Sequence, residues 1–255
     1  MEDDIRRRLR TIEQTYNLRI LYACESGSRA WGFPSPDSDY DVRFIYIRPL
    51  SWYLSIDEKK DSLVLPLTAD RLDFSGWDIR KALRLFRRSN GPLLEWLHSP
   101  ITYLADRSFL EPVRQLEATF LSPRRLVLHY LGLAQSVWES ARAQEQLPVK
   151  ELLYMIRALL AAHWTSEQKG MPPVAIQQLA SLLSDDRQTQ GALHRLLEFK
   201  SMHSENAQQP VPESWQLFFR SEVQFCRERL GQLSRPGSDA TALDRLFQRL
   251  LEEEG

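Results

Sequence analysis

Two aspartates two positions apart, Asp39 and Asp41, are the residues whose spacing most clearly predicts chemistry. Residues i and i+2 of a β-strand point to the same side, about 6–7 Å apart. Two carboxylates held that close repel each other unless a cation lies between them. Mg²⁺ or Mn²⁺, which prefers carboxylate, water and phosphate oxygens, is such a cation. The pair therefore predicts a divalent metal site that also takes phosphate.

A glycine-serine pair upstream supplies groups that bind phosphate. Gly27 lets backbone N–H groups approach an anion closely, and Ser28 adds a hydroxyl donor. Arg29, the next residue, adds a positive charge. We therefore expect a phosphate-binding turn at Gly27 and Ser28, beside the metal site.

A simpler interpretation of the acidic stretch is open at this point. Asp37, Asp39 and Asp41 follow Pro-Ser-Pro, and aspartate favours turns because it hydrogen-bonds its own backbone. A calcium loop of the EF-hand type starting at Asp37 is excluded, because its sixth position is Val42 instead of glycine and its twelfth is Arg48 instead of glutamate. The glycine-serine turn followed by the carboxylate pair is more specific than either part alone.

The elements that must position these residues follow from the apolar pattern. The first half mixes strand and helix patterns, and its expected strands lie at 18–24, 41–47, 61–67 and 70–74. Its expected helices lie at 3–16 and 75–90. In the strand at 41–47, Val42, Phe44 and Tyr46 fall on one side and Arg43, Ile45 and Ile47 on the other.

The second half is helical almost throughout. Its expected helices lie at 122–145, 148–170, 174–184, 187–203, 213–233 and 239–253. The sequence therefore predicts an α/β (α+β) domain with a small mixed sheet at 1–110, followed by an all-α helical domain at 120–255.

Composition limits the class of protein. With 43% hydrophobic and 26% charged residues, the chain has the profile of an ordinary globular protein. Its net charge of -1 gives no general attraction for nucleic acid. Two distant cysteines favour a reducing cytoplasm, and the charged start MEDDIRRRLR does not resemble a signal peptide. No apolar run approaches the roughly 18 residues that span a bilayer, so we expect a cytoplasmic protein outside the membrane.

The motif resembles that of the polymerase-β-type nucleotidyltransferase superfamily, in which Gly-Ser is followed by Asp-x-Asp. Three longer segments are similar to one branch, the RNA repair pathway DNA polymerase beta family (RlaP-type). They are GSRAWGFPSPDSDYDVRFIYI, RKALRLFRRSNGPLLEWLHSP and VKELLYMIRALLAAHW, and the resemblance covers most of residues 20–165. It implies that Asp39 and Asp41 are metal ligands and that Gly27 and Ser28 hold the phosphates of a nucleotide.

Catalytic members of the superfamily carry a third carboxylate on a later strand, and the resemblance implies one here. Asp73, at the end of the expected strand at 70–74, is our choice as third metal ligand and as base for the attacking hydroxyl. Asp70 and Asp78 are the rivals. Asp70 has the setting of a loop residue, and the helix dipole by itself explains an acid at Asp78 in the first turn of the expected helix.

Cations for the triphosphate are expected on two helices. Lys150, Tyr154 and Arg157 are spaced i, i+4 and i+7, so they share one face that we expect to hold the nucleotide; a solvated face is the alternative. Lys81 is expected to face the site from a basic helix at 75–90. The remaining basic residues of that helix are interpreted as solvated, with tracking of a polynucleotide as the alternative.

The sequence thus predicts a Mg²⁺- or Mn²⁺-dependent enzyme that transfers an NMP group from an NTP, ATP among them, to a hydroxyl acceptor. The acceptor is an RNA end, a protein or a small molecule. The alternative of another class is a non-catalytic nucleotide-binding or regulatory module of the same fold, lacking a competent third acid. A third interpretation is a structural protein with a turn at 37–41. Asp73 within reach of the other aspartates would favour the enzyme.

Overall fold

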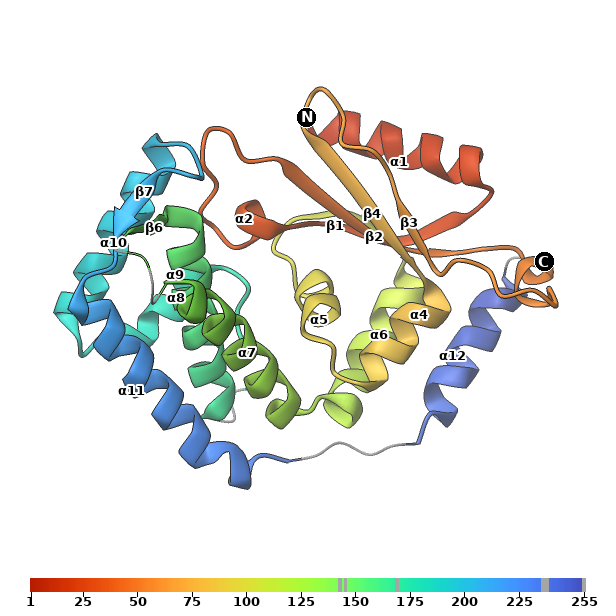
Figure 1. Ribbon diagram of the computed structural model, residues 1–255. Helices are drawn as coiled ribbons and strands as arrows, with labels where there is room; N and C mark the ends of the chain where they lie inside the picture. The colour runs from red at the N-terminus through yellow and green to blue at the C-terminus, as the bar shows by residue number, and fades with distance from the viewer. Residues whose placement is uncertain (142–143, 145, 168–169, 235–238, 254–255) are drawn as a thin grey trace. The chain divides into compact units, whose positions relative to one another are not determined.

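The computed structural model of the chain describes residues 1–255 except 142–143, 145, 168–169, 235–238 and 254–255 (Figure 1). The chain forms two compact units that interleave along the sequence. The first consists of Met1–Gly27, Asp39–Leu121 and Pro236–Gly255, and the second of Ser28–Ser38 and Ser122–Arg235. The domains predicted at 1–110 and 120–255 stay a prediction.

A mixed sheet forms the centre of the first unit, with strand order β3-β4-β2-β1-β5 in the described residues. Its strands are β1 (Arg19–Ser26), β2 (Tyr40–Ile47), β3 (Ser62–Val64), β4 (Leu72–Asp78) and β5 (Thr102–Ala105). β2 and β4 are parallel, whereas the other pairs are antiparallel. The end of β1 and the starts of β2 and β4 therefore lie at the same end of the sheet. This confirms the α/β class with a mixed sheet.

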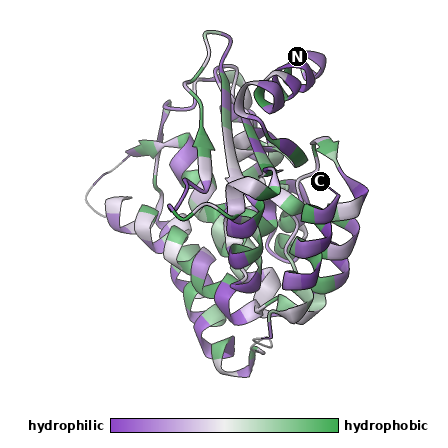
Figure 2. Ribbon diagram, turned by 90° about the vertical axis from the view of Figure 1, so that its right-hand side faces the viewer, coloured by the Kyte–Doolittle hydropathy of each residue, from purple (hydrophilic) through white to green (hydrophobic). Residues whose placement is uncertain are grey.

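Helix α1 (Glu2–Tyr16) covers one face of this sheet (Figure 1). Its apolar residues Ile5, Leu9 and Ile12 are spaced i, i+4 and i+7 and are buried in one cluster with Val42 and Phe44 of β2. Burying each such side chain contributes about 1.5–3 kcal/mol. In Figure 2 this helix, beside the N label, is mostly hydrophilic with hydrophobic residues interspersed, as expected of an amphipathic helix.

Three helices cover the other face: α4 (Ile79–Arg87), α5 (Gly91–Leu97) and α6 (Arg107–Phe120) (Figure 1). Ile45 of β2 lies among apolar residues of these helices, including Phe86, Leu93 and Phe109. Helix α12 (Thr241–Glu252) contacts α4 and α6, and the short α3 (Leu50–Tyr53) follows β2. Because side chains alternate along a strand, Asp41 and Arg43 share the face of Ile45.

The helix predicted at 75–90 starts later than predicted. β4 continues to Asp78, whose side chain accepts the backbone N–H of Arg80 at 2.8 Å and caps α4. Gly76 suits a strand here because the ring of Phe44 lies across it, and a Cβ would meet that ring at 2.2 Å. The pairing of β4 with β2 thus overrides the helical pattern. β5 and α6 were not predicted.

The second unit is helical and confirms most of the predicted helices. They are α7 (Pro123–Ala141), α8 (Val149–Ser166), α9 (Ile176–Leu179), the 3₁₀ turn η1 (Ala180–Leu183), α10 (Arg187–Met202), α11 (Glu213–Arg229) and the 3₁₀ turn η2 (Leu230–Gln232). The predicted end of the first of these helices, at 145, lies outside the described residues. Two short strands not predicted, β6 (Gln146–Pro148) and β7 (Gln208–Pro210), pair with each other.

Helix α8 is buried along most of its length, which explains its nearly continuous apolar sequence. Even so, none of the helices that the structure describes is both long enough and apolar enough to cross a membrane.

Candidate functional site

Asp41 and Asp73 lie side by side at one end of the sheet. They are direct partners in the parallel register of β2 and β4, and Ser26, the last residue of β1, is the partner of Asp41 on its other side. Both aspartates are the second residue of their strand. The two strand starts therefore place two carboxylates, far apart in the sequence, on neighbouring strands at the same level.

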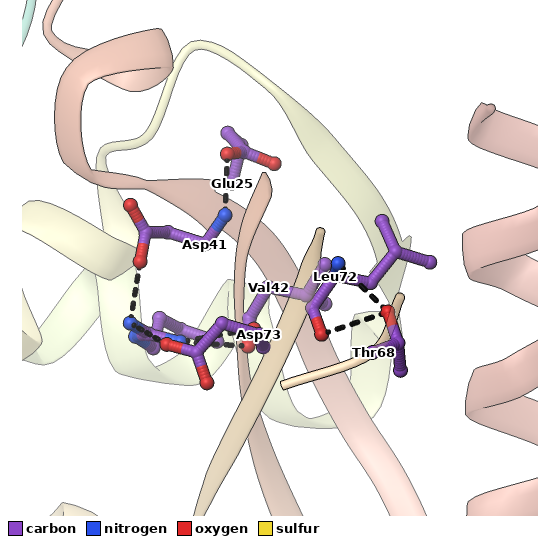
Figure 3. Close-up of polar contacts among 7 residues, drawn as sticks. Glu25, Asp41, Val42, Thr68, Leu72 and Asp73 are labelled. Carbon is purple, nitrogen blue, oxygen red and sulfur yellow. Dashed lines mark hydrogen bonds and ion pairs between the residues drawn. The ribbon is translucent and has the colours of Figure 1, made fainter. Parts of the chain in front are cut away.

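The two carboxylates converge on one nitrogen atom. Nη2 of Arg43 donates to Oδ1 of Asp41 at 2.7 Å and to Oδ2 of Asp73 at 2.8 Å. Figure 3 shows Asp41 and Asp73 with the dashed lines that mark these contacts. Nη1 of Arg43 also donates to the backbone carbonyl of Asp73 at 3.1 Å. The guanidinium therefore bridges β2 and β4 at the level of the two acids.

The sequence predicted a metal ion between Asp39 and Asp41, whereas the structure places Arg43 between Asp41 and Asp73. Two negative charges are held together by one positive charge, which here is a side chain. The donor set of two carboxylates aimed at one point also suits a hard divalent cation, so these residues fit the metal that the family pattern implies. Arg43 was not predicted as a site residue. The available signal was a charged residue within an otherwise apolar strand.

A buried acid holds the start of β2 in place. Glu25 is fully buried, and its Oε1 accepts the backbone N–H of Asp41 at 2.8 Å. The hydroxyl of Tyr103 on β5 donates to Oε2, and the hydroxyl of Ser99 donates to the backbone carbonyl of Glu25 at 2.6 Å. Buried carboxylates need such partners. Glu25 was also missed, although an acid at the end of an apolar run, two residues before Gly27, was a usable signal.

Gly27 lies directly against Asp41. Its φ is +59°, a left-handed conformation that glycine adopts readily. A Cβ on Gly27 would lie 2.1 Å from Oδ2 of Asp41, which is shorter than any real contact. The glycine of the Gly-Ser pair is therefore required both by its backbone conformation and by the carboxylate beside it. Helix α2 (Gly27–Ala30) begins at this residue.

The turn before β4 brings Asp73 to its position. The hydroxyl of Thr68 accepts the backbone N–H of Leu72 at 2.9 Å and donates to the backbone carbonyl of Leu72 at 3.2 Å (Figure 3). The backbone N–H of Tyr40 donates to the carbonyl of Arg71 at 2.9 Å, which ties the two strand starts together. Asp73 follows within two residues, opposite Asp41.

The other candidate acids lie in different surroundings. Asp39 is half-buried and precedes β2 by one residue. Asp70 lies on an exposed turn and bonds Arg8 at 2.8 Å. Asp78 is buried at the opposite end of β4, where burial raises its pKa. Over the described part of the chain, no group of three or more His, Cys, Asp or Glu side chains is arranged to hold a metal, so the carboxylates that the structure brings together are a pair.

Lys81 follows the far end of β4. The five strand steps from Asp73 to Asp78 extend about 16 Å, so the structure does not bring Lys81 to the two aspartates. Its ammonium group pairs with Asp61 at 3.2 Å and lies 5.6 Å from the ring centroid of Trp77.

In the second unit, a buried network fixes the loop at 28–38. The hydroxyl of Ser28 donates to the hydroxyl of Ser38 at 3.1 Å, and Arg29 donates to the carbonyl of Ser38 at 2.9 Å. Ser38 also contacts Ser35, whose hydroxyl accepts a bond from Lys200 at 3.2 Å. Lys200 is fully buried, and burial lowers its pKa. Ser28 and Arg29 of the predicted phosphate-binding turn are thus linked through Ser38 and Ser35 to a lysine far along the chain.

The predicted face of α8 packs against the same loop. Arg157 is 3% exposed, with its guanidinium 4.7 Å from the ring centroid of Trp31, and Tyr154 contacts that ring edge-on at 4.8 Å. Lys150 pairs with Glu205 at 2.9 Å. The structure therefore brings Tyr154 and Arg157 together with Trp31, and this face is partly buried.

Comparisons with known proteins agree with this motif. The model of the RNA repair pathway DNA polymerase beta family matches residues 1–249. The Bacillus subtilis (strain 168) protein named "Uncharacterized protein YcgL" is 37% identical over 246 residues, which span 96% of this chain and 94% of that protein. A crystal structure of a nucleotidyltransferase-like protein from Exiguobacterium sibiricum 255-15 aligns over 98% of this chain and 80% of its own, with 12% identity and a TM-score of 0.33, too low to support an inference. The match along nearly the whole chain confirms the resemblance seen in the sequence: the chain belongs to the RNA repair pathway DNA polymerase beta family.

Proposed function

We propose that this protein is a Mg²⁺- or Mn²⁺-dependent nucleotidyltransferase that transfers an NMP group from an NTP to a hydroxyl acceptor. The observation that carries the proposal is the convergence of the Asp41 and Asp73 carboxylates on a single point. Family membership supports the reaction class of a polymerase-β-type enzyme. The metal, the nucleotide and the acceptor are our proposal.

Asp41 and Asp73, with Asp39, would hold the divalent cation. When bound, such a cation neutralises the polyphosphate and lowers the pKa of the attacking hydroxyl. The acceptor oxygen forms a bond to the α-phosphorus while the bond to the bridging oxygen of the β-phosphate breaks, and pyrophosphate leaves with that electron pair. Asp73 would take the proton of the acceptor hydroxyl.

The groups around the carboxylates have positioning tasks. Glu25 sets the backbone of Asp41 through the 2.8 Å bond from the Asp41 N–H. Backbone N–H groups at Gly27 and Ser28, with the guanidinium of Arg29, would bind the phosphates, because glycine leaves space for an anion next to the backbone. Lys81 has no part in this proposal, since it follows the opposite end of β4.

The description of the family favours an RNA end as the acceptor, and a protein hydroxyl or a small molecule are the other classes to test. We also propose a cytoplasmic location, on the two cysteines, which are free and buried. The net charge of -1 means that an RNA acceptor would be bound by local basic groups and not by the protein as a whole.

The proposal is tested with α-labelled ATP, GTP, CTP and UTP, each with Mg²⁺ and with RNA oligonucleotides, the protein itself and a pool of small hydroxyl compounds as acceptors. We expect label transfer from at least one nucleotide. The variant Asp41→Asn/Asp73→Asn should lose at least about a hundredfold in rate. The matched control Asp70→Asn, on the exposed turn, should retain it. Transfer by the double variant at the wild-type rate would refute the assignment.

A non-catalytic nucleotide-binding module is the second candidate. The observations in its favour are that Arg43 already pairs with both carboxylates and that the described residues form no three-carboxylate metal group. This candidate predicts nucleotide binding by calorimetry without transfer to any acceptor. The two functions are therefore separated by the same labelled nucleotides, with binding and transfer measured on one protein sample.

A further inference from the structure

Arg43 occupies the point that a cation between Asp41 and Asp73 would need. Resting on the proposed function, we infer that Arg43 is a displaceable counter-ion that couples metal binding to nucleotide binding. The divalent cation can bind the two carboxylates only after the guanidinium has broken its ion pairs with them. The polyphosphate of the incoming nucleotide is the anion that receives the guanidinium.

The distances place the guanidinium at the point where a shared cation would bind. Nη2 of Arg43 lies 2.7 Å from Oδ1 of Asp41 and 2.8 Å from Oδ2 of Asp73. Mg²⁺ binds oxygen at about 2.0–2.1 Å, so a shared cation would lie between the same two oxygens. A guanidinium nitrogen at that point excludes it by size and by charge.

The surroundings of Arg43 allow its side chain to change rotamer, but its charge then needs another anionic partner. Its side chain is 18% exposed, and among the described residues its remaining hydrogen bonds are to the backbone carbonyls of Val42 and Asp73, at 3.4 and 3.1 Å. A change of side-chain rotamers therefore releases it without moving β2. A largely buried guanidinium needs a new anionic partner, and the planar fork of arginine suits phosphate oxygens.

This exchange predicts reciprocal coupling between the two ligands. A nucleotide that binds the released guanidinium raises the affinity for the cation, and by linkage the cation raises the affinity for the nucleotide by the same factor. Without nucleotide, the cation must compete with Arg43 and binds weakly. Removing the charge of Arg43 should therefore strengthen binding of the cation alone and reduce the coupling.

The experiment measures the dissociation constant of Mn²⁺ by electron paramagnetic resonance, with and without an NTP analogue that has a methylene between the α- and β-phosphorus. It uses wild type, Arg43→Gln and Arg43→Lys, with Arg8→Gln as the matched control because Arg8 bonds Asp70 on an exposed turn. Circular dichroism melting checks that each variant is folded. No turnover is needed for this readout.

We expect Arg43→Gln to bind Mn²⁺ alone about tenfold or more tightly than wild type, and to show less enhancement by the analogue. Arg43→Lys should also bind Mn²⁺ alone more tightly, because a single ammonium group lacks the fork that bridges both carboxylates, but it should keep more of the enhancement. Arg43→Lys tests the inference if Arg43→Gln does not fold.

Equal or weaker Mn²⁺ binding by both variants in the absence of nucleotide would overturn the inference. If wild type binds Mn²⁺ and the analogue and only the effect of Arg43 is missing, the proposed function stands and the coupling fails. If wild type binds neither ligand in any combination, the proposed function fails, and the inference fails with it.

Discussion

The bridge formed by Arg43 predicts a measurable loss of stability when its charge is removed. Arg43→Gln keeps a polar side chain of similar reach but leaves Asp41 and Asp73 without the cation between them. The two carboxylates then repel each other, and two charge-assisted hydrogen bonds are lost. We expect the variant to unfold more easily than wild type in the absence of divalent cations.

The magnitude follows from the geometry. The contacts of Nη2 with the two acids, 2.7 and 2.8 Å, add to 5.5 Å, so the two oxygens are no farther apart than that. At about 5.5 Å, two unit charges repel by about 3 kcal/mol at an effective dielectric constant near 20 and by about 0.8 kcal/mol in water. The side chains of Asp41 and Asp73 are 29% and 32% exposed, so the repulsion falls between these values. We expect a loss of about 1–3 kcal/mol.

The assay is a double-mutant cycle with Arg43→Gln, Asp73→Asn and the double variant, measured by urea unfolding in EDTA. Asp73→Asn removes one of the two negative charges, so it should restore most of the stability lost in Arg43→Gln. Raising the salt concentration should also reduce the deficit of Arg43→Gln, because salt screens partly exposed charges.

Two results would refute this reasoning. The first is an Arg43→Gln protein within a few tenths of a kcal/mol of wild type at low salt. The second is a double variant whose loss equals or exceeds the sum of the two single losses, which would mean that the acids do not repel each other once Arg43 is gone.

Three further predictions concern the supports of the site. Gly27→Ala should lower the free energy of unfolding in urea by about 1–3 kcal/mol, because φ is +59° and the new Cβ would lie 2.1 Å from Asp41 Oδ2. The control Gly132→Ala, where no atom lies within 4 Å of the new Cβ, should not lower it. Gly76→Ala should lower the melting temperature, since its Cβ would lie 2.2 Å from a ring on β2; an unchanged value would contradict that packing. Burial lowers the pKa of Lys200 from 10.5. At pH values between the lowered pKa and 10.5, the unfolded chain therefore holds a proton on Lys200 that the folded chain has lost. The free energy of unfolding then rises with pH, by at most about 1.4 kcal/mol per pH unit. Lys200→Met should remove that rise, and parallel stability curves for the two proteins would contradict the prediction.

Local pattern was enough to predict the elements nearest the motif. The strands at 18–24 and 41–47 exist as β1 and β2, and the first helix exists as α1, because alternation and helical spacing are properties of neighbouring residues. The Gly-Ser pair after one strand and Asp41 in the next also needed no tertiary information. Family membership could likewise be predicted from the motif, and the comparison along residues 1–249 confirms it.

Predictions from the sequence were less reliable where an element boundary or a side-chain contact depends on a partner strand or a distant helix. The helix predicted from 75 begins at Ile79, because β4 pairs with β2 through Asp78. Lys81 was expected to face the site, but the length of β4 separates it from Asp73. The bond from Lys200 to the hydroxyl of Ser35 joins residues 165 positions apart, so no local pattern could reveal it.

By itself the sequence predicted the chemical type of the candidate site: carboxylates near a glycine turn, at the start of a buried strand. Only the tertiary structure decided which groups meet. The choice among Asp70, Asp73 and Asp78 depends on the register of β2 and β4, which places Asp73 opposite Asp41. Arg43, two residues further along β2, reaches both acids with its guanidinium. Local spacing sets the direction of each side chain, whereas contacts between strands far apart in the chain are set by pairing and packing of the whole sheet.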